Sequence, residues 1–578
     1  MKRNEKTLIY IKSILNITLL FSCFNPVQAN AISIGYQKTD TLKTFPSIIS
    51  VNQSGYNLGS PKRFTVPKST EGQLFIVTEA NNNTPLFKGK LHKGIGDFTA
   101  FNPVDNKGQF VVRVNKLVSY PFSISKHWIE NTFLQSSLDF MIDDRSVVGT
   151  HPSAFGGCPW RDGTYYSFEV PSLIMQYMAN PSTYEALPVQ IDYQKDKQKV
   201  TSPGFKYVMD SEGQDALKTT QKYYTELDAP VGANVPDIVQ LIHWGIGYYM
   251  LNPVTLDPSG DFEGRRLHAQ TVEQFAFFLY AYPMYKKYFT DAYYVKAKEL
   301  AFKSWSDAGL FELFTTVGTG KGRECPGHSI MPNLLMFEVA KREGNKDSSK
   351  FLKAAINQTE WIVKNLDWND PHTTKGQRMS EHKLIPSLVY VLQHYPNQAP
   401  KGLKQKINDW ADIAIKRSNN IWDFRRYDLE SNWTIPEYSE SGNIAGFPAS
   451  ALAAAAVQTD PLKVKRLEQL AFAAIDDLFG RNPLNACSPH HHTLGFQNLE
   501  KGWPKGYIDD ICARLETVRG AISSACSTEM YPYNPNGKFR HPEGWTAFNA
   551  AWNVSLAYLT YYNSGLQFMS KTLQKSKL

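Results

Sequence analysis

Two carboxylic acids lie in sequence contexts that suit acid–base chemistry. Glu543 directly precedes an apolar helical pattern, and burial beside Trp545 would raise its pKa toward the range in which it can donate a proton. Asp162 lies in a loop rich in glycine and aromatic residues, where the neighbouring Arg161 would keep it ionised. One protonated and one ionised carboxyl group is the combination that general acid–base catalysis requires.

Each acid also has a purely structural interpretation. Glu543 could be a charge at a helix N-terminus that interacts with the macrodipole, and Asp162 could form a turn or an ion pair with Arg161. Three further acids at loop or helix starts could replace Asp162 as the base: Glu324, Asp370 and Glu381. His268 and Glu273, which open another helical pattern, could line a cleft or belong to a buried hydrogen-bonded pair.

The periodicity of the chain predicts two domains that would position these residues. Residues 47–128 contain short alternating or apolar runs between turn-forming residues, which predict a β-sandwich. From residue 131 to 570 the apolar spacing is helical. Helices are expected at 131–142, 212–226, 236–250, 268–285, 290–306, 330–343, 349–364, 382–394, 402–418, 444–457, 462–479 and 546–563.

These helices most simply close into an (α/α)6 toroid, in which an inner ring packs inside an outer ring. An open solenoid would show a repeat of roughly 34 to 47 residues, and none is visible. Most candidate residues lie in long irregular stretches, and such loops on a rigid scaffold are usually functional. The stretches are 144–170, 312–329, 365–381, 420–443 and 481–545.

The N-terminus predicts export. Basic residues precede an apolar stretch from Leu8 to Phe24 that is too short and too interrupted to span a bilayer. With the small residues near Ala29, this predicts a signal peptide over residues 1–30 and a secreted, periplasmic or cell-surface protein. The run ending at Cys23 also resembles a lipoprotein box, in which Cys23 would carry a lipid anchor. No transmembrane helix is expected.

Charge and cysteine content narrow the classes of partner. The formal net charge is +8, but the basic residues form no stripe with interleaved aromatics, so nucleic-acid binding is not expected. The cysteines have no C-x-x-C spacing, which argues against a zinc knuckle. No cofactor is expected.

Several motifs together resemble family 9 glycoside hydrolases, the cellulase family. Residues 51–56 (VNQSGY) are similar to the N-terminal immunoglobulin-like module of that family, and 235–238 with 243–245 resemble its first toroid helices. The run 479–484 (FGRNPL), followed by histidines 490–492, resembles its late substrate-binding loop. Glu543 stands six residues before Asn549-Ala550, as the proton-donating Glu of the family does. The landmarks follow the order of the family from residue 51 to 550.

The resemblance implies an inverting hydrolase of a β-linked glycan, with Glu543 as the acid. Some relatives bind structural calcium in their loops, so the resemblance allows it here, but the sequence has no calcium-ligand motif. The base loop of the family reads Asp-Ala-Gly-Asp, whereas this chain has Asp162 in the position of the supporting Asp and Thr164 in the position of the base. The resemblance therefore implies a divergent branch. Asp162 is the candidate base because it is the only Asp left in this loop.

A sugar substrate gives the nearby aromatic and histidine side chains a role. The apolar face of a pyranose packs well on an aromatic ring, and the candidate platforms are Trp160, Trp433, Trp545 and Tyr165. Adjacent loop histidines point in different directions and have no further ligand at metal spacing. We therefore expect His491 and His492, together with Arg161, to bind the substrate.

Two other functions fit part of the pattern. Helical toroids also host polysaccharide lyases, which cleave uronate-containing glycans through a Tyr/His pair and a cationic group. Tyr165 or Tyr166, His491 and Arg161 could take these roles. The missing second Asp also allows a catalytically inactive carbohydrate-binding protein.

Overall fold

The structure is a computed structural model, and it describes residues 48–104, 108–149, 165, 168–205, 211–252, 262–315, 326–370, 373, 381–426, 441–482, 520, 546–565 and 567–569. At 211–213, 262–268, 381 and 441–443 only the backbone is described. All described residues belong to one compact unit, Phe45–Leu578. The expected signal peptide and Cys23 lie outside them. None of the described helices is both long and apolar enough to cross a membrane.

Residues 48–125 form the predicted β-sandwich. Its strands are β1 (Gly55–Asn57), β2 (Arg63–Thr65), β3 (Leu74–Glu79), β4 (Phe87–Lys90), β5 (Ile95–Asp97), β6 (Phe110–Val114), β7 (Leu117–Val118) and β8 (Ser123–Ser125). One sheet has the order β4-β3-β6-β7; β1 pairs in parallel with β8, and β2 pairs antiparallel with β5. The two apolar runs that predicted strands at 73–77 and 109–114 are β3 and β6, which pair antiparallel at the centre of the larger sheet.

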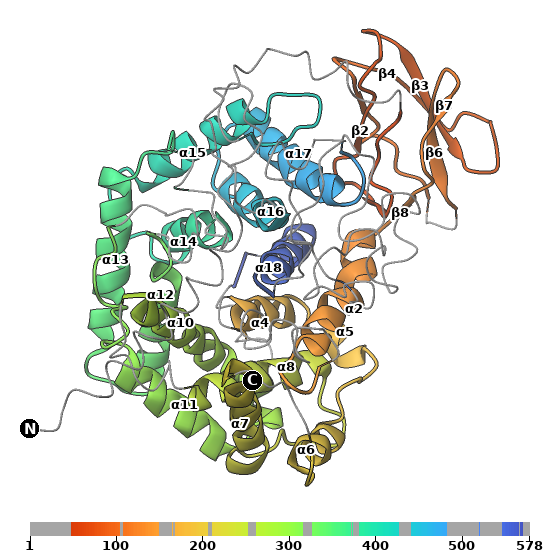
Figure 1. Cartoon of the computed structure of the whole chain (residues 1–578). Helices are drawn as coiled ribbons and strands as arrows, with labels where there is room; N and C mark the ends of the chain where they lie inside the picture. Colours follow the sequence, from red (N-terminus) through yellow and green to blue (C-terminus); the bar gives the residue numbers. More distant parts are fainter. Residues whose placement is uncertain are drawn as a thin grey trace, which may run out of the picture. The chain divides into compact units, whose positions relative to one another are not determined.

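Twelve of the described helices form an inner and an outer ring (Figure 1). The inner helices are α4 (Glu169–Ala179), α10 (Phe262–Tyr285), α12 (Ile330–Arg342), α14 (Glu381–His394), α16 (Ser441–Ala455) and α18 (Thr546–Asn563). The outer helices are α2 (Trp128–Asp143), α8 (Asp237–Leu251), α11 (Asp291–Ser304), α13 (Ser348–Asn365), α15 (Leu403–Arg417) and α17 (Pro461–Leu478). Each inner helix contacts the next, and α18 contacts α4, which closes the ring.

Burial explains which helices are inner. On outer helix α13, buried residues recur at helical spacing, with Phe351, Ala355 and Ile362 on one face. On inner helix α18, almost every residue is buried, because neighbours cover it on all sides. The fold therefore has six helical hairpins, each made of one outer helix followed by one inner helix.

One ring helix was missed in the sequence, and one correctly predicted helix lies outside the rings. Inner helix α4 lies partly within the predicted loop 144–170; it is short and buried on nearly all faces, so it has no polar face that would reveal a helical period. The predicted helix 212–226 exists as α7 (Ser211–Glu226), but it packs on α8 and α6 (Tyr193–Thr201) outside the two rings. Helix α2 also begins at Trp128 rather than at 131.

The hairpin order determines where the long connections gather. Because every outer helix runs opposite to the inner helix that follows it, all outer-to-inner connections lie at one end of the ring. That end carries the N-termini of the inner helices, and we call it the N-terminal end. The described ends of the predicted functional stretches 144–170, 312–329, 365–381, 420–443 and 481–545 lie at this end.

Specific hydrogen bonds join the sandwich to the helical rings. Asn52 Nδ2 donates to Asp476 Oδ1 at 2.9 Å, and the Gln53 amide donates to the Phe479 carbonyl at 2.8 Å. Arg481, which is fully buried, donates to Thr65 Oγ1 at 3.2 Å. Residues 479–482 were expected in a substrate-binding loop. Two of them, Phe479 and Arg481, instead anchor the sandwich through their bonds to Gln53 and Thr65.

Candidate functional site

The two inner helices that follow Asp162 and Glu543 in the chain contact each other at their starts, at the N-terminal end of the ring. Glu169 opens α4 seven residues after Asp162, and Thr546 opens α18 three residues after Glu543. Thr546 Oγ1 donates a hydrogen bond of 2.7 Å to Glu169 Oε1, and both residues are buried. The contact holds the starts of two inner helices together directly beside the two predicted catalytic segments.

Most predicted site residues lie outside the described residues. These are Glu543, Asp162, Trp160, Arg161, Tyr166, His491, His492, Trp433 and Trp545, together with Glu324 and the side chains of Glu381 and His268. Asp370 is described and lies half-buried on the connection from α13 to α14. Asn549, used in the family comparison, is buried on α18, and its Nδ2 donates to the Gly520 carbonyl at 2.8 Å.

Tyr165 does not fit its predicted role as a sugar platform. Its side chain is fully buried, and its hydroxyl donates to the Met141 carbonyl. The backbone carbonyl of Tyr165 in turn accepts a hydrogen bond from the Tyr249 hydroxyl. Burial raises the pKa of this phenol well above its ordinary value, chiefly by desolvation and then through Asp144. The ring packs in the core because Gly245 leaves room for it on α8.

A buried charged cluster occupies the same end of the ring. Glu273 of α10 accepts from Lys383 Nζ of α14 at 3.1 Å, and its other oxygen lies 2.8 Å from His328 Nδ1. The exposed fractions of the three side chains are 0% for Glu273, 4% for Lys383 and 7% for His328. Burial alone would raise the pKa of Glu273, but Lys383 and His328 outweigh it and lower the pKa, so the carboxylate is ionised.

Aromatic rings fix the surroundings of this cluster. Lys383 Nζ lies 4.8 Å from the centre of the Phe168 ring, a cation–π distance. The neighbouring His382 packs its ring 5.3 Å from the same phenylalanine, and a methyl group at Gly446 would lie 3.2 Å from His382 Nδ1. Desolvation, reinforced by Lys383, holds the pKa of His382 well below its usual range. His382 is therefore a neutral imidazole between α4, α14 and α16.

The sequence indicated only one member of this cluster. Glu273 was expected either in a cleft or in a buried hydrogen-bonded pair, and it is buried and paired. His328 and Lys383 were not predicted, because they lie 55 and 110 residues away in the chain. Their positions in the sequence could have indicated them, because His328 and Lys383 each lie at the start of an expected helix that follows a long loop.

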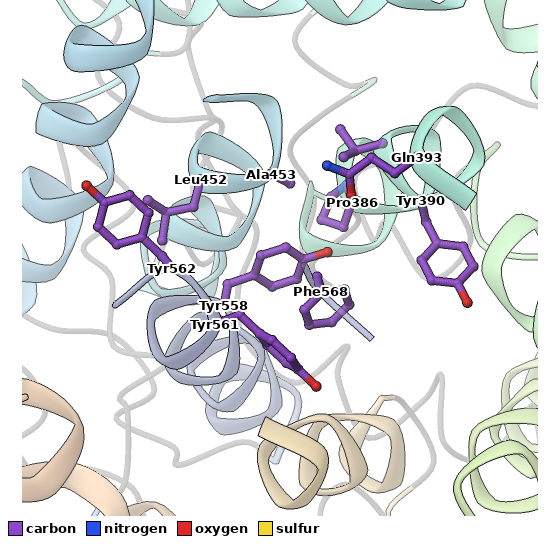
Figure 2. Close-up of a pocket in the computed structure, with 10 residues that line it drawn as sticks. Pro386, Tyr390, Gln393, Leu452, Ala453, Tyr558, Tyr561, Tyr562 and Phe568 are labelled. Carbon is purple, nitrogen blue, oxygen red and sulfur yellow. The ribbon is translucent and has the colours of Figure 1, made fainter. Parts of the chain in front are cut away.

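A separate pocket lies among the inner helices α14, α16 and α18. Its volume is about 50 Å³. The lining residues are Pro386, Val389, Tyr390 and Gln393 of α14, Leu452 and Ala453 of α16, Tyr558, Tyr561 and Tyr562 of α18, and Phe568. Figure 2 shows the aromatic rings of α18 and Phe568 gathered at this pocket. It contains none of the predicted catalytic residues.

The structure also bears on metal binding. Within the described ranges, no three His, Cys, Asp or Glu side chains are grouped so that they could hold a metal ion. The histidines 490–492 lie outside those ranges, so their expected role in substrate binding stays a prediction.

Comparison with known proteins establishes the fold. No protein-family model matches the chain, and no curated protein is similar to it in sequence. A family 9 glycoside hydrolase of Bacteroides ovatus superimposes with a TM-score of 0.53 at 13% identity, over 89% of this chain and 99% of its own. A single-mutant thermostable endoglucanase from Alicyclobacillus acidocaldarius gives a TM-score of 0.53 at 14% identity, over 89% of this chain and 100% of its own.

The solved structure of AaCel9A, in complex with cellobiose-like isofagomine, gives a TM-score of 0.54 at 14% identity over 89% of this chain and 99% of its own. The chain has the fold of the family 9 glycoside hydrolases. Because the similarity extends over nearly the full length of these proteins, it includes both the β-sandwich and the (α/α)6 toroid. The predicted fold class is therefore confirmed.

Proposed function

We propose that the protein is a glycoside hydrolase that cleaves a β-linked glucan-type polysaccharide or oligosaccharide with inversion of configuration. The observation that carries the proposal is the hydrogen bond between Glu169 and Thr546. It joins the starts of the two inner helices that follow Asp162 and Glu543 in the chain. The shared fold with endoglucanases, one of them bound to a cellobiose-like ligand, supports the same substrate class.

In this proposal Glu543 protonates the leaving oxygen. Inverting hydrolysis also needs a base on the other face of the sugar, with roughly 6.5–9.5 Å between the two groups to leave room for water. The sequence offers Asp162 for that position. The sugar rings would stack on Trp160 and Trp545, with Arg161, His491 and His492 contacting hydroxyl groups.

The signal peptide predicted from the sequence would place this activity outside the cytoplasm. We propose that residues 1–30 direct secretion, to the periplasm or to the cell surface, and that a lipid on Cys23 is the alternative means of retention. An extracytoplasmic location suits an enzyme whose substrate is a polymer too large to enter the cell.

The polysaccharide lyase is the weaker candidate. One of its two possible phenols, Tyr165, is buried with its hydroxyl committed to a backbone carbonyl, so it is not free to take a proton from a substrate. No described residue favours the lyase over the hydrolase.

An assay on a panel of β-glucans and uronate-containing glycans separates the candidates. We expect new reducing ends without absorbance from an unsaturated uronate. Growth of that absorbance would instead indicate a lyase, and glycan binding without either product would indicate a carbohydrate-binding protein.

A further inference from the structure

The larger sheet of the sandwich has one buried face and one open face. It consists of β4, β3, β6 and β7 (Figure 1), and successive side chains of a strand point to opposite faces of a sheet. Phe75 and Val77 of β3 and Val112 and Val114 of β6 belong to the core of the sandwich. The residues that alternate with them point to the other side, which we call the outer face.

One row of side chains crosses all four strands on the outer face. The register places Lys88 of β4 opposite Ile76 of β3. Ile76 lies opposite Arg113 of β6, which in turn lies opposite Val118 of β7. Neighbouring strands are about 4.8 Å apart, so the backbones of Lys88 and Arg113 are roughly 10 Å apart. Cationic and aliphatic side chains therefore alternate across the sheet.

The next row repeats this pairing of a cation with an aliphatic side chain. Lys90 of β4 lies opposite Leu74 of β3. Leu74 is 64% exposed and Val118 is 49% exposed, and both lysines of β4 are exposed as well. Single exposed aliphatic side chains are common on protein surfaces, but these two share one face with three cations.

The cations of the outer face are not neutralised. Arg113 Nε donates to Thr78 Oγ1 on the neighbouring strand at 3.2 Å. Among the described residues, no carboxylate forms an ion pair with Lys88, Lys90 or Arg113. All residues of these four strands are described, and none of the outward-pointing ones is acidic. The outer face is therefore positive throughout and attracts an anionic partner.

Protection of a sheet edge explains only part of this pattern. Lysines on an edge strand discourage pairing with another chain, and β4 is an edge strand. Arg113 and Leu74, however, lie on β6 and β3 in the interior of the sheet, where there is no edge to protect. Val118 exposes an aliphatic side chain on β7, which is the other edge.

We propose that the outer face of this sheet binds the surface of an anionic phospholipid bilayer. Lys88, Lys90 and Arg113 contact the headgroup phosphates, while Leu74 and Val118 enter the boundary between headgroups and acyl chains. The periplasmic or cell-surface location proposed above brings the protein to such a surface. The inference does not depend on the hydrolase function.

The mixture of side chains favours lipid over an acidic glycan. A soluble acidic glycan would pair with the cations but leave the aliphatic side chains in water. Sugar rings also pack on aromatic side chains, and the outward-pointing residues of these fully described strands include no aromatic ring. A bilayer surface offers both phosphates and an apolar boundary.

Sedimentation with vesicles measures the binding. The wild type should bind vesicles of equal parts phosphatidylcholine and phosphatidylglycerol, more weakly at high salt, and should not bind vesicles of phosphatidylcholine alone. The combined variant Lys88→Gln, Lys90→Gln and Arg113→Gln should lower the partition coefficient about 100-fold, at about fivefold per cation. Every protein compared carries Cys23→Ser, so that no lipid on Cys23 contributes, and the same N-terminus, whose contribution cancels in the ratio.

Two matched controls separate the outer face from overall charge and hydrophobicity. Replacing Lys346, Lys353 and Lys404 by Gln removes the same charge from exposed positions on or beside the outer helices α13 and α15. It should leave the partition coefficient nearly unchanged. Leu74→Gln should lower the partition coefficient severalfold, because the inserted leucine leaves water. Leu462→Gln should not lower it, although Leu462 of α17 is 77% exposed.

Three results would overturn the proposal. The first is a wild type that does not bind the anionic vesicles. The second is an equal loss of binding in the two triple variants, both folded by circular dichroism, since net charge alone would then account for it. The third is a partition coefficient that Leu74→Gln does not change, together with tight binding of the wild type to polygalacturonate, which would identify an acidic glycan as the partner instead.

Discussion

Asp423→Asn should cost several kcal/mol of unfolding free energy, because one carboxylate joins three arginines at the junction of sandwich and rings. Asp423 lies 2.6 Å from Arg63 of the sandwich, 2.7 Å from Arg481 and 2.8 Å from Arg466 of α17. Its side chain is 1% exposed. Desolvation alone would raise the pKa of Asp423, but the arginines outweigh it and lower the pKa to about 2.

The magnitude follows from this shift. A displacement of about two pKa units corresponds to about 2–3 kcal/mol of stabilisation of the folded state at neutral pH. Removing the charge also leaves buried arginines without their counter-charge, which raises the expected cost to about 3–5 kcal/mol. Since the folded pKa is lowered, the stabilisation is complete above about pH 4 and disappears as the pH falls through 2.

Urea unfolding of the wild type and of Asp423→Asn, measured from pH 7 down to pH 2, tests this reasoning. The difference in unfolding free energy should be largest at pH 7 and shrink below pH 4. Asp412→Asn is the control, because its ion pair with Lys463 leaves Asp412 56% exposed; its loss should be below about 1 kcal/mol. A loss of that size for Asp423→Asn, or a difference that does not change with pH, would refute the account.

Three further predictions concern the same junction. Burial raises the pKa of Asp476 to about 7, so the contribution of its protonated form to stability is complete below about pH 4 and is lost as the pH rises through 7. In urea unfolding, Asp476→Asn should therefore be more stable than the wild type at pH 8 but not at pH 4. Gly55→Ala should lower the melting temperature more than Gly59→Ala. A methyl group at position 55 would lie 2.4 Å from Trp128 Nε1, whereas one at position 59 would meet nothing within 4 Å. Equal shifts in melting temperature would contradict this. Deleting 48–127 should give aggregated protein in size-exclusion chromatography, and a monodisperse, fully active truncation would count against a stabilising role.

Sequence periodicity predicted the architecture well where an element has one polar and one buried face. Outer helix α13 has that pattern and was placed close to its observed bounds. Strands β3 and β6 were found from their apolar runs. Inner helix α4 was missed, because neighbours bury nearly all of its residues and its sequence has no periodic polar positions. The expected number of ring helices was still correct, because the expected set included α7 and lacked α4.

Motif recognition was more reliable for the fold than for residue roles. The runs 51–56 and 479–484 correctly indicated a sandwich followed by a toroid. Their described residues meet at the junction, where the backbone amide of Gln53 donates to the Phe479 carbonyl at 2.8 Å. A short motif does not reveal such a partner, so residues 479–482 were assigned to the substrate rather than to the sandwich.

The candidate site shows the same dependence on distant contacts. The sequence placed Glu273 at the start of a helix and foresaw a buried pair, but its partners become visible only when α10, α12 and α14 are brought together. Tyr165 has the residue type of a sugar platform, and only the packing against Gly245 and the bond to Met141 reveal that it belongs to the core.

The central claim, hydrolysis with Glu543 as the proton donor, is tested most directly by measuring reducing ends released from β-glucan and aryl β-glycosides by the wild type and Glu543→Gln. The variant should lose most of its turnover on β-glucan, whose leaving oxygen is basic, and much less on an aryl glycoside with an acidic leaving group. Equal losses on both substrates, or no loss on β-glucan, would contradict the assignment of Glu543 as the acid.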